Sequence, residues 1–141
     1  MKPNPIRALT TLFLVHGAAL TAAESKVDFV TQIKPILQSA CINCHHSEGL
    51  FGNLNLENRE RAFAPRREGA VIVPGSSEKS PLLTVLTLPP KETKKAMPPT
   101  GHRIEKEKVG LIRAWIDQGA AWPEGKDGVI KPLRTSAKPA K

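Results

Sequence analysis

Large aromatic side chains are scarce in this 141-residue chain. It contains no tyrosine, two tryptophans and four phenylalanines, so aromatic residues make up 4% of the sequence. A small domain has little core to stabilise it, and one with so few large side chains gains from a planar apolar group bound at its centre. The composition therefore favours a domain that a cofactor completes.

An apolar run long enough to span a bilayer is also missing. The stretch from Ala8 to Leu20 has about 13 residues, whereas a membrane helix needs roughly 20. It follows a positively charged start and ends in small residues, which is the pattern of a secretory signal peptide. We expect cleavage of residues 1–23 after Ala23. The mature protein would then be soluble and periplasmic, in an oxidising compartment.

The two cysteines of the chain lie in one motif, Cys41-Ile42-Asn43-Cys44-His45. The pattern C-x-x-C-H is the attachment signature of a c-type haem. Two intervening residues place the sulfurs about one helical turn apart, near the separation of two neighbouring vinyl groups, and the next residue brings an imidazole to the iron. We therefore expect Cys41 and Cys44 to carry one covalent haem c and His45 to be its proximal ligand.

Two other functions of a C-x-x-C pair stay open at this point. A structural zinc ion usually takes four ligands, and without a second C-x-x-C the remaining candidates are His16, His45, His46 and His102. A thiol-disulfide redox pair usually follows a strand of a βαβ unit, and no parallel-strand pattern precedes the motif. Both alternatives fit the sequence less well than haem attachment.

Methionine is as scarce as cysteine. Because Met1 leaves with the signal peptide, Met97 is the single thioether of the mature chain, and Pro98 and Pro99 stiffen its loop. A thioether opposite an imidazole favours Fe(II) and raises the reduction potential, which suits an electron carrier. We predict that Met97 is the distal iron ligand. The alternatives are a core methionine and ligation by His102, while His46 is expected on the surface beside the haem edge.

Helical periodicity dominates the regular segments. A helix is predicted over residues 26–40, beginning at a capping box in Ser25-Lys26-Val27-Asp28 and bending or restarting at Pro35. Weaker helical patterns cover residues 56–63 and 80–88. The sequence therefore predicts an all-α domain.

The C-terminal part of the chain has one clear element. An apolar stripe over residues 105–118 predicts a helix that buries Trp115 and ends at Gly119. Residues 124–141 contain five basic and two acidic residues and no apolar periodicity, so we predict a disordered tail. The domain would then cover residues 24–123.

Several short motifs follow one another along residues 26–123. They are Pro35-Ile36-Leu37, Cys41-x-x-Cys44-His45, Gly49-Leu50, Leu54-Asn55-Leu56, Ile72-Val73-Pro74-Gly75, Ser80-Pro81-Leu82, Met97-Pro98-Pro99 and Trp115-Ile116-x-x-Gly119-Ala120-x-Trp122-Pro123. In this order they resemble the planctomycete-type cytochrome c domain. The resemblance implies a small, class I-like cytochrome c fold wrapped around one covalent haem, with His45 and Met97 as iron ligands. The chain departs from the family at residues 64–69, which are often glycine-rich in such domains.

These features predict a soluble, exported, mono-haem cytochrome c that carries single electrons between redox partners and is not an enzyme. The alternatives are a haem enzyme or gas sensor with a labile distal ligand, and an electron-transfer subunit of a larger dehydrogenase. No distal Arg-His pair with peroxidase spacing is visible in the sequence, and an intact distal methionine favours the carrier.

The balance of charge indicates the kind of partner. The chain has 21 basic and 13 acidic residues, and its net charge of +8 falls to +6 once Lys2 and Arg7 leave with the signal peptide. Basic residues flank the predicted distal loop at Lys91, Lys94, Lys95, Lys106 and Lys108. We expect an acidic redox protein as partner. Nucleic acid is a poorer candidate, because the chain is exported and no aromatic residues alternate with the lysines.

Overall fold

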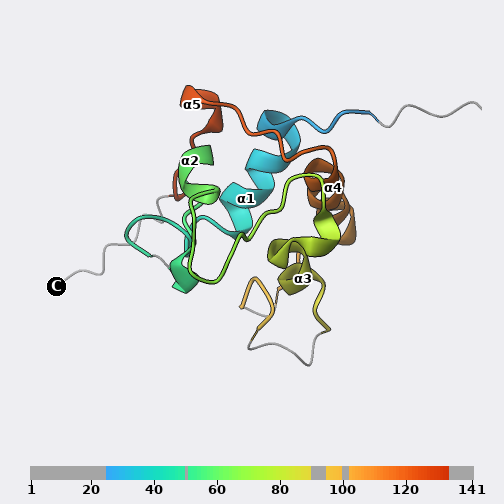
Figure 1. Cartoon of the computed structure of the whole chain (residues 1–141), viewed down its shortest axis with the longest axis horizontal. Coiled ribbons are helices and arrows are strands. Elements are labelled where there is room, and N and C mark those ends of the chain that lie inside the picture. Colours follow the sequence, from blue (N-terminus) through green and yellow to red (C-terminus); the bar gives the residue numbers. More distant parts are fainter. Residues whose placement is uncertain (1–24, 50, 90–94, 100–101, 134–141) are drawn as a thin grey trace, which may run out of the picture.

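Short helices surround a central helix in the computed structural model, which describes residues 25–49, 51–89, 95–99 and 102–133 (Figure 1). In chain order they are the π-helical turn η1 (Phe29–Ile33), α1 (Lys34–Ala40), the 3₁₀ turn η2 (Phe51–Asn53), α2 (Arg59–Ala62), the 3₁₀ turn η3 (Ser77–Lys79), α3 (Pro81–Thr87), α4 (Lys106–Asp117) and α5 (Gly125–Gly128). These residues contain no strand, which confirms the all-α class. The predicted signal peptide lies outside the described residues.

Helix α1 runs through the middle of the molecule, with α3 and α4 on one side and α2 and α5 on the other (Figure 1). Within the described part of the chain, every helix is too short or too polar to cross a bilayer.

The first helical segment begins later than the sequence predicts. Its N-cap is Asp28 rather than Ser25, because the Asp28 carboxylate accepts hydrogen bonds from the backbone N–H and the hydroxyl of Thr31 at 2.8 and 2.7 Å. The N–H of Val27 instead donates to the side chain of Gln118 at 2.8 Å. Pro35 stands in the first turn of α1, where a missing N–H is tolerated, so the chain restarts there as one of the two predicted alternatives requires.

Four aromatic side chains form one cluster in the core. The ring centroids of Phe29 and Trp122 are 4.5 Å apart, Trp115 lies 5.9 Å from Phe29, and Phe63 meets Trp122 edge-on at 6.2 Å. Trp115 is buried, and its indole N–H donates to the carbonyl of Ala121 at 2.7 Å. The prediction that Trp115 packs in the core is therefore confirmed.

Buried hydrogen bonds tie the middle of the chain to α3 and α4. The hydroxyl of Ser80, which is fully buried, accepts from the N–H of Val73 and donates to the carbonyl of Ser76, both at 2.9 Å. The N–H of Gly75 donates to the carbonyl of Ile116 at 2.7 Å. These contacts fix the loop that precedes α3. Helix α3 itself, Pro81–Thr87, confirms the helix predicted at residues 80–88.

Helix α4 ends where the sequence predicts. The chain beyond it differs from the prediction, because it packs on the domain. Gly119 adopts a φ of +99°, and its N–H bonds back to the carbonyl of Ile116 at 2.9 Å. Farther along, the indole of Trp122 donates to the carbonyl of Gly128 at 2.8 Å. A Cβ at residue 128 would lie 1.8 Å from the carbonyl oxygen of Pro123, so only glycine allows α5 to pack here.

The prediction of a disordered tail is wrong for residues 124–133. Ile130 is fully buried, and its N–H donates to the carbonyl of Glu57 at 2.8 Å. Packing against the domain therefore continues past residue 123 to Ile130. One buried isoleucine and a few backbone contacts hold this segment, and they leave no periodic pattern in the sequence. Residues 134–141 lie outside the described residues.

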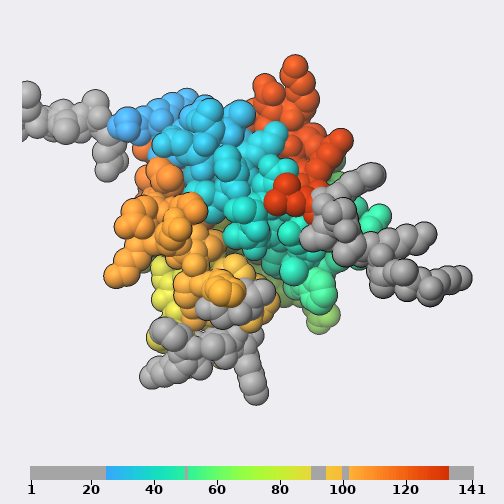
Figure 2. All heavy atoms as spheres, turned by 180° about the vertical axis from the view of Figure 1, so that it is seen from behind, coloured from blue at the N-terminus to red at the C-terminus, as the bar shows by residue number. Residues whose placement is uncertain are grey.

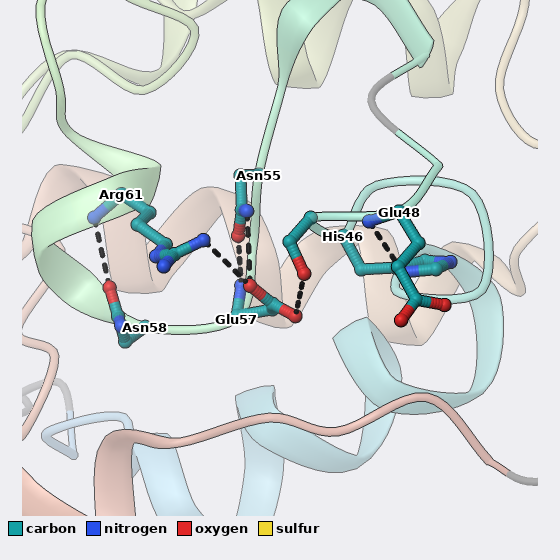
Figure 3. Close-up of polar contacts among 7 residues, drawn as sticks. His46, Glu48, Asn55, Glu57, Asn58 and Arg61 are labelled. Carbon is teal, nitrogen blue, oxygen red and sulfur yellow. Dashed lines mark hydrogen bonds and ion pairs between the residues drawn. The ribbon is translucent and has the colours of Figure 1, made fainter.

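A polar network holds the segment that follows His45 (Figure 3). The carboxylate of Glu57 accepts hydrogen bonds from the side chains of Ser47 at 2.9 Å, Asn55 at 3.1 Å and Arg61 at 3.1 Å. The N–H of Leu56 donates to the carbonyl of His45 at 2.8 Å. Desolvation acts to raise the pKa of Glu57, but the bonds from Asn55 and Ser47 together with the charge of Arg61 outweigh it and lower that pKa.

We predict that Ile130→Ala destabilises the protein, because it removes a fully buried side chain from the core. The free energy of unfolding should fall by about 2–5 kcal/mol, measured by chemical denaturation. Leu133→Ala is the matched control, since Leu133 is 52% exposed and its truncation should have almost no effect. Equal, small effects of both substitutions would mean that the segment after α4 does not pack on the domain.

We predict that Glu57→Gln lowers the free energy of unfolding at neutral pH, with an effect that disappears in acid. A carboxyl group whose pKa is lowered by folding stabilises the native state above its unfolded pKa of about 4.3, and this contribution is lost as the pH falls through the folded pKa. Denaturation between pH 3 and 7 measures the difference from the unchanged protein. The exposed Glu48→Gln is the control, and a Glu57→Gln effect that is constant with pH would contradict the account.

Candidate functional site

A cavity of about 520 Å³ opens between α1, α3 and the start of α4. This volume lies in the range of about 300–1,000 Å³ that small-molecule and cofactor sites occupy. Much of its wall is aliphatic: Ile36, Leu54, Leu56, Val71, Leu82, Val85, Leu86 and Ile104 line it. The cavity is therefore suited to a largely apolar ligand.

The turn that follows α1 supplies one wall of the cavity. The N–H groups of Cys41 and Ile42 both donate to the carbonyl of Leu37, at 3.0 and 2.9 Å, and the N–H of His45 donates to the carbonyl of Cys41 at 3.1 Å. Ile42 is fully buried in the core, whereas Cys41, Cys44 and His45 line the cavity. The three predicted haem-attachment residues thus come together at one wall, at the C-terminal end of α1 as predicted.

The methionine segment supplies another part of the wall. Met97 is half-buried there, and its N–H donates to the carbonyl of Val85 on α3 at 3.0 Å. The gold and orange surface of residues 95–99 and 102–108 lies next to the cyan surface of α1 in Figure 2. His102 is exposed and also lines the cavity, so both predicted candidates for the distal ligand reach it. His46 does not line it, and its Nδ1 accepts a hydrogen bond from the N–H of Glu48 at 3.3 Å (Figure 3).

The two cysteines differ in environment. Cys44 is exposed, whereas burial, helped by the neighbouring Cys44, raises the pKa of the Cys41 thiol to about 12. Thiols that exchange with disulfides need a lowered pKa, so Cys41 is unsuited to that chemistry. Across the described ranges, His, Cys, Asp and Glu side chains form no group of three or more that could hold a metal ion. The thiol-disulfide and zinc alternatives therefore gain no support from the geometry.

The environment of His45 favours a neutral imidazole. Desolvation lowers the pKa of His45, the backbone carbonyl of Phe51 opposes this shift, and the positive charge of Arg66 adds to it. A histidine must be neutral to donate its lone pair to a metal. His45 is therefore poised for ligation at neutral pH.

Buried nitrogens without partners point to a bound group. In the described part of the chain, the buried side-chain nitrogens and oxygens that lack a hydrogen bond are His45 Nδ1, Arg66 Nε and Arg103 Nη1. All three of these residues line the cavity. An unsatisfied buried polar group costs about 1–3 kcal/mol, so partners are expected from a ligand.

The residues present fit a haem. The cavity has an apolar wall for a porphyrin, two thiols three positions apart for its vinyl groups, and an imidazole and a thioether for its iron. Neither Arg66 nor Arg103 was predicted from the sequence as a site residue. The departure from the family pattern at residues 64–69 was a signal for Arg66, whereas nothing in the sequence singled out Arg103.

The comparisons with known proteins bear on the same stretch. Residues 41–101 match the family model described as planctomycete cytochrome C, so the match begins at the first cysteine of the motif and runs past Met97. No curated protein and no solved structure matches the chain. The match confirms the resemblance seen in the sequence. Over residues 41–101 the chain therefore resembles a planctomycete-type cytochrome c domain, and this match supports a haem-containing electron-transfer protein.

Proposed function

We propose that the protein is a soluble, exported cytochrome c that holds one haem and carries single electrons between redox partners. The observation that carries this proposal is the gathering of Cys41, Cys44, His45 and Met97 around one apolar cavity. A single haem follows from the single C-x-x-C-H motif. The signal-peptide pattern of residues 1–23 supports export to the periplasm.

Cys41 and Cys44 would hold the cofactor covalently. Each thiol would hold the porphyrin through a thioether bond to one of its vinyl groups. Because Ile42 between the cysteines is fully buried, the backbone fixes the direction of both sulfurs.

His45 and Met97 would be the two iron ligands. When bound, the haem supplies an iron that changes reversibly between Fe(III) and Fe(II). His45 donates the lone pair of a neutral imidazole, and the backbone bond from Met97 to Val85 holds the thioether segment on α3. A soft thioether would stabilise Fe(II) and raise the reduction potential, and the aliphatic wall would give the haem an apolar environment.

Electrons would enter at the rim of the cavity. Cys44 is exposed, and Phe51 is 66% exposed, although both line the cavity. A cofactor edge attached at Cys44 would therefore lie near the surface. No catalytic residue is required for this function, because one electron arrives and leaves without making or breaking a substrate bond.

We predict that Met97→Ala abolishes the sulfur-to-iron charge-transfer band of the oxidised protein and lowers its reduction potential, since the thioether is lost. His102→Ala is the matched control, because His102 lines the same cavity, and it should keep the band. Absorption spectra and a redox titration of both variants measure the effect.

Other outcomes of this experiment would contradict the proposal. If the unchanged protein lacks the band, and His102→Ala changes its spectrum while Met97→Ala does not, His102 is the distal ligand. An unchanged oxidised protein that lacks the band and binds cyanide at once would have an open iron site, which favours the haem enzyme or gas sensor.

We further propose that an acidic redox protein docks beside the distal segment. Lys95, Lys106 and Lys108 are exposed there, and Lys108 lies at the cavity with an ion pair to Glu105 at 3.0 Å. The other two lysines of the predicted cluster, Lys91 and Lys94, lie outside the described residues. Attraction between a basic face and an acidic partner speeds their encounter, and salt screens it within about 8 Å at physiological ionic strength.

We predict that the rate of oxidation by an anionic complex such as ferricyanide falls as salt is added, because screening weakens its attraction to the basic face. Stopped-flow measurements across a salt titration test this. Replacing Lys95, Lys106 and Lys108 by glutamine should flatten the salt dependence.

The matched control replaces Lys79, Lys126 and Lys131 by glutamine, which removes the same charge from exposed positions that do not line the cavity. It should keep most of the slope. Equal slopes in the two triple variants would show that the rate responds to net charge alone and that the distal segment is not the docking face.

A further inference from the structure

Two arginines of the cavity wall have no role in the proposed function. Arg66 and Arg103 both line the cavity, and each has one buried nitrogen without a hydrogen-bond partner, Nε in Arg66 and Nη1 in Arg103. They account for all the unsatisfied buried side-chain polar atoms of the described residues except His45 Nδ1. Their placement calls for an acceptor that the described polypeptide does not provide.

Arg66 is held in place from one side. It is half-buried in the loop after α2, and its Nη2 donates to the backbone carbonyl of Gly52. The next residue, Arg67, is exposed and does not line the cavity. The backbone therefore directs one of two adjacent arginines to the cavity and the other to solvent.

Arg103 is held in a similar way at another part of the wall. It is half-buried before α4, and its Nη2 donates to the carbonyl of Pro89 at 3.2 Å. Each guanidinium is thus anchored through one nitrogen to a backbone carbonyl, while another nitrogen stays buried and unpaired. A guanidinium group that is anchored through one nitrogen and keeps free N–H donors is suited to bind a carboxylate.

The charges of the wall do not balance. The ionisable side chains that line the cavity, apart from the cysteines and His45, are Arg66, His102, Arg103, Glu105 and Lys108. Glu105 is the one carboxylate among them, and it pairs with Lys108 at 3.0 Å. Within the described residues neither arginine forms a salt bridge. Half-buried cations without a counter-charge are costly, so a ligand with carboxylates would stabilise the fold.

We propose that Arg66 and Arg103 bind the two propionate carboxylates of the haem. This inference rests on the proposed function, since it requires a haem in the cavity. Each guanidinium donates to a carboxylate from the nitrogen that now lacks a partner. The departure from the glycine-rich family pattern at residues 64–69 then has a use, because it places a fixed positive charge at the cofactor.

The two arginines would also keep the propionates ionised. A cation within hydrogen-bond distance lowers the pKa of a carboxylate by about 1–3 units. The ionised propionates would then be neutralised by the guanidinium groups, and the reduction potential would not change with pH between about 5 and 8. Without an arginine, an ionised propionate would stabilise Fe(III) and lower the potential, and it would take up a proton more easily as the pH falls.

The test is a redox titration of the haem-bound protein at several pH values. The unchanged protein should give a flat potential from about pH 5 to 8. Arg66→Gln and Arg103→Gln should each lower the potential at pH 8 and make it rise toward pH 5, with the propionate pKa raised by about 1 unit or more. Arg→Lys at the same positions should restore most of the flat profile, because the charge is kept.

The controls separate charge near the cavity from charge in general. Arg67→Gln and Lys79→Gln each remove one positive charge from an exposed residue that does not line the cavity, and they should leave the profile flat. Imidazoles also change protonation in this pH range, so the titration is repeated with His102→Asn in the background. The effect of the glutamine substitutions should persist there.

Three outcomes would count against the proposal. A flat profile in both glutamine variants, with haem still bound, overturns it and leaves the proposed function intact. Profiles that match those of Arg67→Gln overturn it in the same way. If the unchanged protein carries no covalent haem, the proposed function fails and this inference fails with it. Should one glutamine variant not fold, the glutamine variant at the other position decides.

Discussion

The burial of Ile42 is the constraint on which the site depends. Its side chain is fully buried in the core and its N–H donates to the carbonyl of Leu37, so the turn after α1 is anchored to the core. Cys41, Cys44 and His45 surround this anchor in sequence and line the cavity. Groups that must meet one rigid planar ligand need a backbone that does not rotate, and a buried residue between the two cysteines supplies it.

The core has two parts, a cluster of aromatic side chains and a cavity wall that is mostly aliphatic. Phe29, Phe63, Trp115 and Trp122 pack on one another and none of them lines the cavity, whose wall is mostly aliphatic. The aromatic cluster supports α1 and α4 from within the polypeptide. Among the described residues that line the cavity, Phe51 is the one phenylalanine, tyrosine or tryptophan, and it is exposed at the rim, so a porphyrin would complete this side of the core. The few aromatic residues of the chain are thus concentrated away from the cavity, and the cavity wall is the part of the domain that lacks them.

The parts of the structure that sequence could predict are those that leave a local pattern. The apolar stripe and Gly119 located α4, Pro35 located the restart of α1, and the C-x-x-C-H motif located the wall of the cavity. The local pattern predicts an N-cap at Ser25, whereas the structure has it at Asp28. The difference arises because the N–H of Val27 bonds to Gln118, a long-range contact that no local motif reveals.

Long-range contacts explain the other failures too. The segment after residue 123 is held by the burial of Ile130 and by its bond to Glu57, and neither has a periodic signature. Arg66 and Arg103 are ordinary charged residues in sequence, and only their burial beside the cavity distinguishes them from exposed neighbours such as Arg67. Met97 was found because it is the single internal methionine, and its backbone bond to Val85 was not foreseeable.

Covalent attachment at Cys41 and Cys44 is the central claim, and the mass of the intact protein tests it most directly. Protein purified from cells that attach haem to exported cytochromes should weigh more than the polypeptide by the mass of one haem, and acidified acetone should not extract it. Cys41→Ala and Cys44→Ala should each keep one thioether, and the double variant should release its haem. Extractable haem in the unchanged protein, or haem that resists extraction in the double variant, would contradict the account.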